Sequence, residues 1–298
     1  RFIRKKVYTL SWRTVVVQTH SKLSYKDGYM IVKGENMNMV HLSEIGTLVV
    51  NSTSVSITSA LICELVKNKV NLIMCDEKHN PLAELNAYYG AYNTSKKVRQ
   101  QVEWDEDYKK YVWTLLIQQK IMNQANVLHK AGFIEAEKLY DYAQNVIFFD
   151  QTNREGHAAK VYFNRLFGKN FSREYECDIN AALDYGYAIL LSVFNREIVL
   201  NGYITQLGIK HINEYNQFNL SCDIMEPFRV IVDWYVYNNR ERMFNQEYKY
   251  DLINLLNLKV EMNDKELYLS NAIKLYTSRV FKAIEKKSAK ELVLFRYP

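Results

Sequence analysis

Two short segments of this sequence place a carboxylate and an imidazole where they could bind a metal ion. Glu155 follows Asn153, whose residue type favours the N-cap of a helix, so the Glu155 side chain would project from the first helical turn. His211 ends the segment 208–211, Gly-Ile-Lys-His. Each has an ordinary explanation too, because an acid in a first turn complements the helix dipole and a single histidine is usually a hydrogen-bonded polar residue. Their spacing alone does not bring them together.

A third segment adds two acids at an expected helix boundary. Asp223 and Glu226 are three residues apart, and Pro227 follows Glu226 directly. Because proline favours the first position of a helix and disfavours α geometry in the residue before it, we expect Glu226 at a helix start or a kink. The two acids could converge there as metal ligands, or they could serve as a cap and a partner of the helix dipole.

Together the three segments offer one imidazole and two or three carboxylates. Carboxylates suit Mg²⁺ or Mn²⁺, and an imidazole shifts the preference toward manganese. Such an ion can polarise a phosphoryl oxygen, help to form an alkoxide from a 3′-hydroxyl and stabilise the charge on a leaving oxygen. The chemistry that this set favours is the displacement of one oxygen by another at a phosphodiester.

The sequence upstream of these segments is typical of strands. Residues 14–19 are a β-branched run, and the dipeptide 27–28, Asp-Gly, lies between apolar stretches as in a type I′ hairpin. Further strands are expected at about residues 39–42, 47–50 and 70–75. A short helix is expected at 58–68. We therefore predict a small N-terminal β-domain over residues 1–85, whose first ten residues are a basic lead-in of undetermined origin.

Helical periodicity replaces the strand pattern after the turn dipeptide 80–81, Asn-Pro. The polar stretch that follows lacks clear alternation, and we interpret residues 86–97 as a linker. Segments with the length and spacing of amphipathic helices lie near residues 113–121, 133–145, 154–167, 178–201, 227–243 and 265–286. We therefore expect a larger all-α catalytic domain over residues 98–298 and, for the whole chain, an α+β fold of two domains.

The composition excludes several classes of protein. The 298 residues are 48% hydrophobic and 24% charged, as in globular proteins, and only 10 glycines and three prolines occur, which disfavours a turn-rich all-β fold. The four cysteines are too widely spaced for zinc fingers and suit free thiols in a reducing compartment. Since no signal peptide and no apolar run of roughly 18 residues is visible, we expect a cytoplasmic protein without membrane contact. A net charge of +6 and 23 tyrosines are compatible with a DNA partner without proving one.

Five segments in this order resemble the integrase subunit of CRISPR adaptation systems, most closely its type II branch. They are WRTVVV at 12–17, NREGHAA at 153–159, DINAALDYGY at 178–187, GIKH at 208–211 and DIMEPFR at 223–229. The resemblance extends from about Ser11 to the C-terminal helices. Two departures lie outside these metal motifs: the basic residues 1–10 precede the usual start of type II members, and Ser11 stands where glycine is common.

The resemblance implies that Glu155, His211 and Glu226 are the ligands of a catalytic Mg²⁺ or Mn²⁺ ion. In many other branches of the family the third ligand is an aspartate, so Glu226 is a longer acid in that role. Asp223 matches an additional acidic position near the metal, which supports the ligands or serves as an alternative ligand. Three basic residues are candidates for DNA contacts only because they flank this site, and each could equally be an ordinary surface charge: Arg154, Lys210 and Arg229.

The resemblance also implies the partners and the reaction. A homodimer, in two copies, would hold a dimer of a small ferredoxin-like adaptation partner in a heterohexamer. This assembly would bind a short double-stranded DNA fragment and join its 3′-hydroxyl ends to CRISPR repeat DNA by transesterification, which is spacer acquisition in antiviral defence. Type II systems add a further adaptation protein and an RNA-guided effector nuclease. Two alternatives stay open: a generic metal-dependent endonuclease acting on branched or single-stranded DNA, and a DNA-binding scaffold without catalysis.

Overall fold

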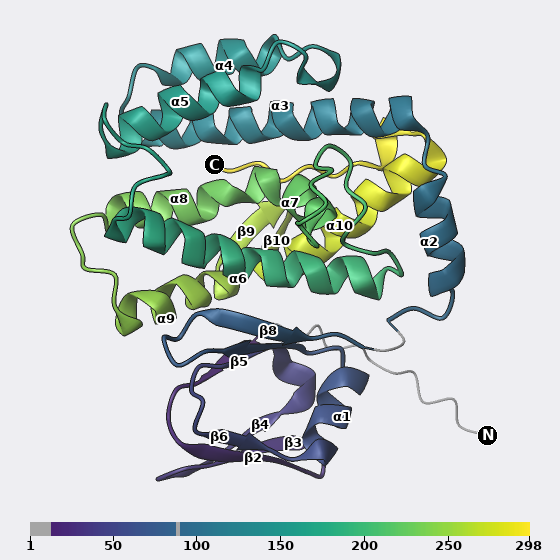
Figure 1. Ribbon diagram of the computed structural model, residues 1–298, viewed down its shortest axis with the longest axis vertical. Helices are drawn as coiled ribbons and strands as arrows, with labels where there is room; N and C mark the ends of the chain where they lie inside the picture. The colour runs from purple at the N-terminus through teal and green to yellow at the C-terminus, as the bar shows by residue number, and fades with distance from the viewer. Residues whose placement is uncertain (1–12, 88–89) are drawn as a thin grey trace. The chain divides into compact units, whose positions relative to one another are not determined.

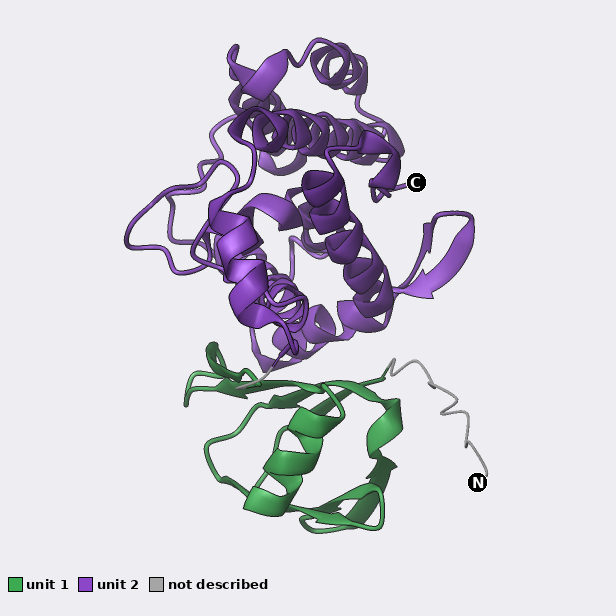
Figure 2. Cartoon of the chain, turned by 90° about the vertical axis from the view of Figure 1, so that its right-hand side faces the viewer, with its two compact units in different colours: residues 1–87 green, residues 88–298 purple. Residues whose placement is uncertain are grey.

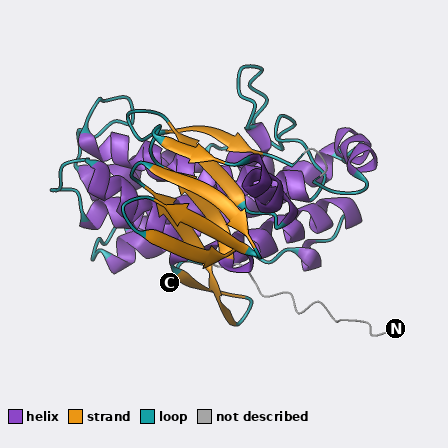
Figure 3. Cartoon of the chain, turned by 90° about the horizontal axis from the view of Figure 1, so that it is seen from below, coloured by secondary structure: helices purple, strands orange, loops and turns teal. Residues whose placement is uncertain are grey.

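A computed structural model describes residues 13–87 and 90–298 of the chain, which divides into two compact units, Arg1–Ala87 and Tyr88–Pro298 (Figure 2). The basic lead-in 1–10 and the start of the segment 12–17 lie outside the described residues. Strands gather in the first unit, and the second is largely helical (Figure 3). This confirms the predicted α+β class, with a small β-rich N-terminal region and a larger helical C-terminal region.

Two four-stranded sheets build the first unit. One has the order β1 (Arg13–Val17), β5 (Ile45–Val50), β7 (Asn71–Cys75), β8 (Pro81–Leu85), and the other the order β4 (Met37–His41), β3 (Tyr29–Lys33), β2 (Ser21–Lys26), β6 (Val55–Ile57). Helix α1 (Ser59–Lys67) packs with them around a core that includes Leu23, Met30, Leu48 and Leu61, none of which is accessible to solvent. Apolar residues on the inner faces of the strands thus form a core that belongs to this unit alone.

The predicted turn and the predicted helix of this unit are both confirmed. Asp27 and Gly28 have positive φ, 48° and 88°, and join β2 to β3 with Lys26 opposite Tyr29, as a type I′ turn requires. The hydroxyl of Thr58 accepts a hydrogen bond from the backbone at the start of α1. The strands expected at 39–42, 47–50 and 70–75 are present with shifts of one or two residues at their ends.

The two units divide between residues 87 and 88, two residues beyond the predicted end of the β-domain at residue 85, and one strand before this boundary was not predicted. Residues 81–85 form β8, an antiparallel edge strand that pairs with β7 on one side only, so its side chains need not alternate between core and solvent. The predicted linker 86–97 also extends too far, because helix α2 (Thr94–Val102) begins inside it. The sequence of α2, TSKKVRQQV, contains two apolar residues, Val98 and Val102, which are too few to indicate a helix by their spacing.

The second unit is built around the long helix α3 (Glu106–Lys130), which packs against α4 (Ala136–Gln144) and α5 (Arg154–Phe167) along one side (Figure 1). The remaining helices are α6 (Asp178–Leu200), α7 (Asn219–Met225), α8 (Arg229–Asn238), α9 (Gln246–Asn254) and α10 (Leu269–Lys286). Helix α6 packs against α7, α8, α9 and α10. None of the helices within the described ranges is both long and apolar enough to cross a membrane.

The expectation of an all-α second domain is wrong at one place. Residues 259–262 and 265–268 form the antiparallel hairpin β9 (Lys259–Met262) and β10 (Lys265–Tyr268), and α10 therefore begins at Leu269 rather than at residue 265. Asn263 and Asp264 both have positive φ in its two-residue turn. The Asn-Asp pair is a weaker hairpin signal than Asn-Gly or Asp-Gly, and half of the residues in each short strand are charged, so the sequence does not predict this hairpin.

Candidate metal centre

Two side chains cap helix α5 and fix the direction in which Glu155 leaves its first turn. The Asp150 carboxylate accepts hydrogen bonds from the backbone N–H of Arg154 at 2.8 Å and of Glu155 at 3.0 Å. The side-chain oxygen of Asn153 accepts from the Gly156 N–H at 3.2 Å, which confirms the predicted N-cap. Both Asp150 and Asn153 have positive φ, so the chain turns sharply before the helix begins.

Glu226 lies in a single 3₁₀ turn, residues 226–228, that joins α7 to α8. Its backbone has α geometry, with φ −50° and ψ −45°, although Pro227 follows it, so the expectation that proline would exclude this geometry is wrong. The missing N–H of Pro227 falls in the first turn of the new helical segment, where no intrahelical partner is needed. Glu226 therefore stands at a helix junction, as predicted, and its side chain is buried.

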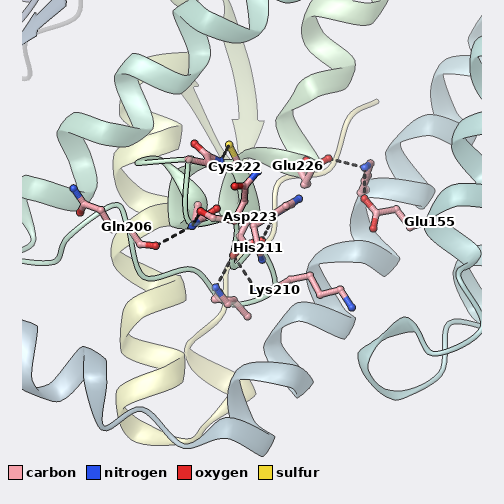
Figure 4. A network of polar contacts seen from close by, with 12 residues as sticks. Glu155, Gln206, Lys210, His211, Cys222, Asp223 and Glu226 are labelled. Carbon is pink, nitrogen blue, oxygen red and sulfur yellow. Dashed lines mark hydrogen bonds and ion pairs between the residues drawn. The ribbon is translucent and has the colours of Figure 1, made fainter. Parts of the chain in front are cut away.

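Lys120 of α3 connects Glu155 with Glu226. Its Nζ lies 2.6 Å from Glu155 Oε1 and 2.6 Å from Glu226 Oε2, and its side chain is 10% exposed. Figure 4 shows the side chains of Glu155 and Glu226 on either side of this position. Burial would lower the pKa of Lys120, but the carboxylates of Glu226 and Glu155 outweigh burial and raise this pKa, so the ammonium stays charged. Two acids from separate elements thus converge on one buried position that holds a cation.

Sequence reasoning did not identify Lys120 as a site residue. Lys120 follows Ile117 by three residues, so it shares a face of α3 with Ile117 and Ile121, both of which are fully buried. A lysine in the middle of an apolar helix face is the signal that could have been used, because an ammonium is almost never buried unless it is paired.

Glu226 has a second cationic partner in Arg229, whose Nε donates to Glu226 Oε1 at 2.9 Å. Burial would raise the pKa of Glu226, but the ion pairs with Arg229 and Lys120 bring it down to about 2, so this carboxylate is ionised at neutral pH. The Arg229 guanidinium also lies over the Tyr187 ring, 4.6 Å from its centroid. Arg229 therefore faces the interior of the unit.

Asp223 holds the segment 208–211 in place and orients His211. It is fully buried, and its Oδ2 accepts hydrogen bonds from the N–H of Ile209 at 2.5 Å and of Lys210 at 2.9 Å. Its Oδ1 lies 2.6 Å from His211 Nδ1. The hydrogen bond to Asp223 raises the pKa of His211, although burial opposes this. Since both Asp223 oxygens are engaged and Nδ1 is taken, Nε2 is the His211 nitrogen left to bind a ligand.

Gly208 permits this close approach. A Cβ at this position would lie 2.3 Å from the His211 carbonyl oxygen and 2.7 Å from Asp223 Oδ2, closer than real Cβ contacts. Only glycine lets the backbone of the segment fold onto the Asp223 carboxylate. The glycine of the GIKH segment is therefore a structural requirement of the site.

The donor set fits a divalent metal ion. Glu155 and Glu226 supply carboxylate oxygens, and His211 lies close enough for both charges to contribute to its raised pKa. Within the part of the chain that the structure describes, Glu226 Oε2 is buried and accepts no well-directed hydrogen bond, although Lys120 is near. Among the described residues, no three aspartate, glutamate, histidine or cysteine side chains lie close enough together to bind one ion without a rearrangement. Two carboxylates and an imidazole are nevertheless the ligands that Mg²⁺ and Mn²⁺ accept.

The three basic residues that are candidates for DNA contacts lie in three different environments. The Lys210 Nζ lies 3.9 Å above the Phe149 ring, and Arg229 is paired with Glu226. The Arg154 guanidinium lies 5.1 Å from the centroid of the Tyr142 ring. Arg154 also lines a cavity of about 500 Å³ together with Lys138, Tyr142, His157, Lys160, Val161, Asn164, Arg165 and Lys169. The lining of this cavity is predominantly basic.

Comparison with known proteins gives a consistent result. Residues 14–266 match the family described as CRISPR associated protein Cas1. The chain is 31% identical over 293 residues to the CRISPR-associated endonuclease Cas1 of Neisseria meningitidis serogroup C (strain 8013), covering 96% of each protein. It is 26% identical over 244 residues to the CRISPR-associated endonuclease Cas1 1 of Pyrobaculum aerophilum, covering 71% of this chain and 76% of that protein.

Solved structures show the same fold. A CAS1 protein from Thermotoga maritima matches with a TM-score of 0.69 and 13% identity, over 96% of this chain and all of that one. A chain of a Cas6-RT-Cas1–Cas2 complex matches with a TM-score of 0.71 and 17% identity over 97% of this chain, which spans 36% of that longer chain. The family match over most of the sequence and the close relative in Neisseria meningitidis show that this chain belongs to the Cas1 family of CRISPR-associated endonucleases.

Proposed function

We propose that this chain is a metal-dependent DNA integrase of CRISPR adaptation, which joins the 3′-hydroxyl ends of short foreign DNA fragments to the CRISPR repeat. The convergence of Glu155 and Glu226, from two different helical elements, on one buried cation position carries this proposal. The reaction exchanges one phosphodiester for another, so it needs no external energy source. The five sequence motifs favour the type II branch of the family.

We assign the binding of Mg²⁺ or Mn²⁺ to Glu155, Glu226 and the Nε2 atom of His211. A bound ion of this kind polarises a phosphoryl oxygen and stabilises charge on the attacking and leaving oxygens. Asp223 holds the imidazole of His211 in the orientation that leaves Nε2 available. Arg229 keeps Glu226 ionised, so we assign it to this internal role in place of a DNA contact.

DNA would contact the basic surfaces beside this centre. The cavity between α4 and α5 presents the charged groups of Arg154, Lys138 and Lys160, and Lys210 is exposed next to His211. Phosphate contacts of this type give binding that depends strongly on salt and little on sequence. They would position a duplex end, while the metal centre acts on the bond at that end.

The assembly that we propose is a homodimer that joins, in two copies, a dimer of the small ferredoxin-like adaptation partner. Two structural neighbours support a Cas2 partner, because they are solved as Cas6-RT-Cas1–Cas2 complexes with TM-scores of 0.71 and 0.65. In a type II system the further adaptation protein and the RNA-guided effector nuclease are additional partners. We place the protein in the cytoplasm, where it would act on DNA.

A strand-transfer assay tests the proposal. The purified protein, its small partner, a duplex with 3′-hydroxyl ends and a repeat-containing plasmid are incubated with Mg²⁺ or with Mn²⁺, and joined products are resolved on a gel. We expect joining by the wild type and a loss of at least about 100-fold for Glu155→Ala and for His211→Ala, since a metal ligand is removed. Glu247→Ala is the control, because Glu247 is likewise an acid in a first helical turn, that of α9, but it is exposed and lies outside the assigned centre.

The same assay separates the alternatives. Cleaved DNA without joined strands would show that water is the nucleophile and that the protein is a nuclease rather than an integrase. Full joining by Glu155→Ala or His211→Ala would show that the assigned centre is wrong. DNA binding without any chemistry, unchanged by these substitutions, would identify a scaffold.

A further inference from the structure

We propose that Lys120 is a built-in counter-ion that competes with the metal ion for Glu155 and Glu226, and so sets the affinity of the centre for divalent cations. This inference rests on the proposed function, because it takes these two acids as metal ligands. It concerns a residue that none of the sequence motifs contains. In this role Lys120 lowers the affinity of the centre for the ion and is not itself a ligand.

The geometry makes the two cations mutually exclusive at these oxygens. The Lys120 ammonium lies 2.6 Å from an oxygen of Glu155 and 2.6 Å from an oxygen of Glu226. Mg²⁺ and Mn²⁺ bind carboxylate oxygens at about 2.1 Å, so an ion on the same oxygens would lie within about 5 Å of Nζ. Like charges at that distance in a buried site repel strongly. The ammonium must leave at least one carboxylate when the ion binds.

The surroundings of Lys120 indicate a dedicated ion pair rather than a chance surface contact. Its side chain is 10% exposed, on a helix face that also carries the buried Ile117 and Ile121. The two acids come from α5 and from the turn at 226–228, so neither is a neighbour of Lys120 along α3. Among the described residues, Lys120 is the one cation within ion-pair distance of Glu155.

Glu226 and Glu155 differ in what happens when Lys120 moves away. Glu226 keeps a second partner, because Arg229 Nε donates to its other oxygen at 2.9 Å. Glu155 loses Lys120, which is the one cation within ion-pair distance of it among the described residues. A divalent ion that displaces Lys120 therefore restores the neutralisation of Glu155 while Arg229 continues to hold Glu226. The metal-binding equilibrium includes the loss of the Lys120 ion pairs, which weakens the apparent affinity.

Mn²⁺ titration of the full chain without DNA tests this competition, with free Mn²⁺ followed by electron paramagnetic resonance. We expect Lys120→Met to lower the Mn²⁺ dissociation constant by at least about tenfold, the factor that one charge-assisted hydrogen bond is worth. Lys109→Met is the matched control, because Lys109 is on the same helix, is 14% exposed and pairs with Glu106 at 2.6 Å, away from the centre. It should leave the dissociation constant within about twofold of the wild type. An equal or weaker affinity in Lys120→Met would overturn the inference.

A second measurement uses the wild type, so that it does not depend on the folding of a variant. Acetylation of lysines is followed by mass spectrometry with and without saturating Mn²⁺. Because the ion displaces the Lys120 ammonium from the carboxylates, we expect the labelling of Lys120 to rise severalfold while that of Lys109 stays constant. Unchanged labelling of Lys120 at saturating Mn²⁺ would also overturn the inference.

Glu155→Ala distinguishes this inference from the proposed function. If Glu155→Ala binds Mn²⁺ as the wild type does, the assigned metal centre is wrong and the inference falls with it. If Glu155→Ala loses Mn²⁺ binding and Lys120→Met does not bind more tightly, the centre stands and only the competition by Lys120 is refuted.

Discussion

Asp223 and the two glutamates use their carboxylates in different ways. Glu155 and Glu226 present oxygens to the Lys120 ammonium, whereas both oxygens of Asp223 accept hydrogen bonds from the backbone of residues 209–211 and contact His211 Nδ1. A carboxylate that accepts this many hydrogen bonds in a fully buried position cannot turn toward an ion without leaving buried N–H groups unpaired. Of the two roles expected for Asp223, the contacts favour support of the ligands.

Asp223→Asn tests this role at the residue scale. The substitution keeps the shape of the side chain but removes the charge, and one of its two acceptor atoms becomes a donor that faces backbone N–H groups. We expect the pKa of His211 to fall relative to the wild type, because the hydrogen bond to Asp223 is the main reason that it is raised. We also expect a loss of about 10–100-fold in Mn²⁺ affinity. The His211 pKa is followed by NMR titration of the imidazole.

The control is Asp107→Asn, because the Asp107 side chain is 89% exposed. It should change neither the His211 pKa nor the Mn²⁺ affinity. A wild-type pKa of His211 in Asp223→Asn would mean that another group orients the imidazole.

The sequence was sufficient to predict which residues form the centre, but it did not predict which side chains they contact. Glu155, His211 and Glu226 stand in motifs whose residue types suggest ligands. From the sequence, Lys120 is a residue on a helix face and Arg229 could be a surface charge. The packing of separate elements is what brings Glu155 and Glu226 to Lys120. Pairing across elements has no sequence period, so it was not predictable from spacing.

At the scale of the elements, the buried carboxylate of Asp233 links helices α5, α6 and α8 through hydrogen bonds. Asp233 of α8 is 1% exposed and accepts hydrogen bonds from the hydroxyl of Tyr162 on α5, at 3.1 Å, and from that of Tyr187 on α6. Glu155 lies in the first turn of α5, and Glu226 lies in the turn 226–228, which directly precedes α8. The Asp233 contacts therefore help to set the spacing between the two glutamates.

Asp233 gives folding stability a specific dependence on pH. Burial raises the pKa of Asp233 to about 6, although the hydrogen bonds from Tyr187 and Tyr162 oppose this shift. A pKa raised above its unfolded value contributes stability that is fully present below the unfolded pKa and is lost as pH rises through about 6. The loss is at most about 3 kcal/mol. Asp233→Asn removes this titration, so the unfolding free energy of the wild type relative to the variant should fall between about pH 4 and pH 7.

Urea unfolding of both proteins across this pH range provides the measurement, with Asp107→Asn again as the exposed control. If the difference in unfolding free energy between the wild type and Asp233→Asn does not change with pH, Asp233 does not titrate as described.

An element was predictable from the sequence where its own residues include a strong cap or turn signal. Helix α5 starts where the Asn153 cap predicts, and the hairpin at 27–28 has the expected turn chemistry. The edge strand β8, the polar helix α2 and the hairpin β9–β10 were missed. Each of the three has a weak pattern of its own, since pairing or packing with neighbouring elements decides its structure.

At the scale of the whole molecule, the C-terminal segment of the chain packs against α3 and against the turn that carries Glu226. The side-chain amide of Asn123 on α3 donates to the carbonyl oxygens of Pro227, at 2.8 Å, and Phe295, at 3.0 Å, and its oxygen accepts from the Tyr297 N–H at 3.0 Å. The Phe295 ring stacks on that of Phe228 at 4.4 Å. The turn that carries Glu226 is thus supported by residues about 70 positions further along the chain, which no local pattern reveals.

The net charge of +6 is a property of the whole chain, and it acts on DNA only where the basic groups face one surface. The cavity between α4 and α5 is such a surface, and Lys138 and Lys160 are exposed at it. If both contact phosphates, the double variant Lys138→Gln, Lys160→Gln should lower the slope of log Kd against log salt concentration by about 2, because each lost contact removes about 0.9 released counterions. Fluorescence anisotropy with a short duplex measures this slope.

The control for this last prediction is the double variant Lys67→Gln, Lys259→Gln, which removes the same charge from two exposed lysines that pair with glutamates elsewhere. Net charge alone would weaken DNA binding equally in both double variants, whereas a DNA path along α4 and α5 weakens it mainly in the first. The Mn²⁺ affinity should be unchanged in both, because none of the four lysines contacts Glu155 or Glu226 within the described residues. Equal slopes in the two double variants would place the DNA on another face.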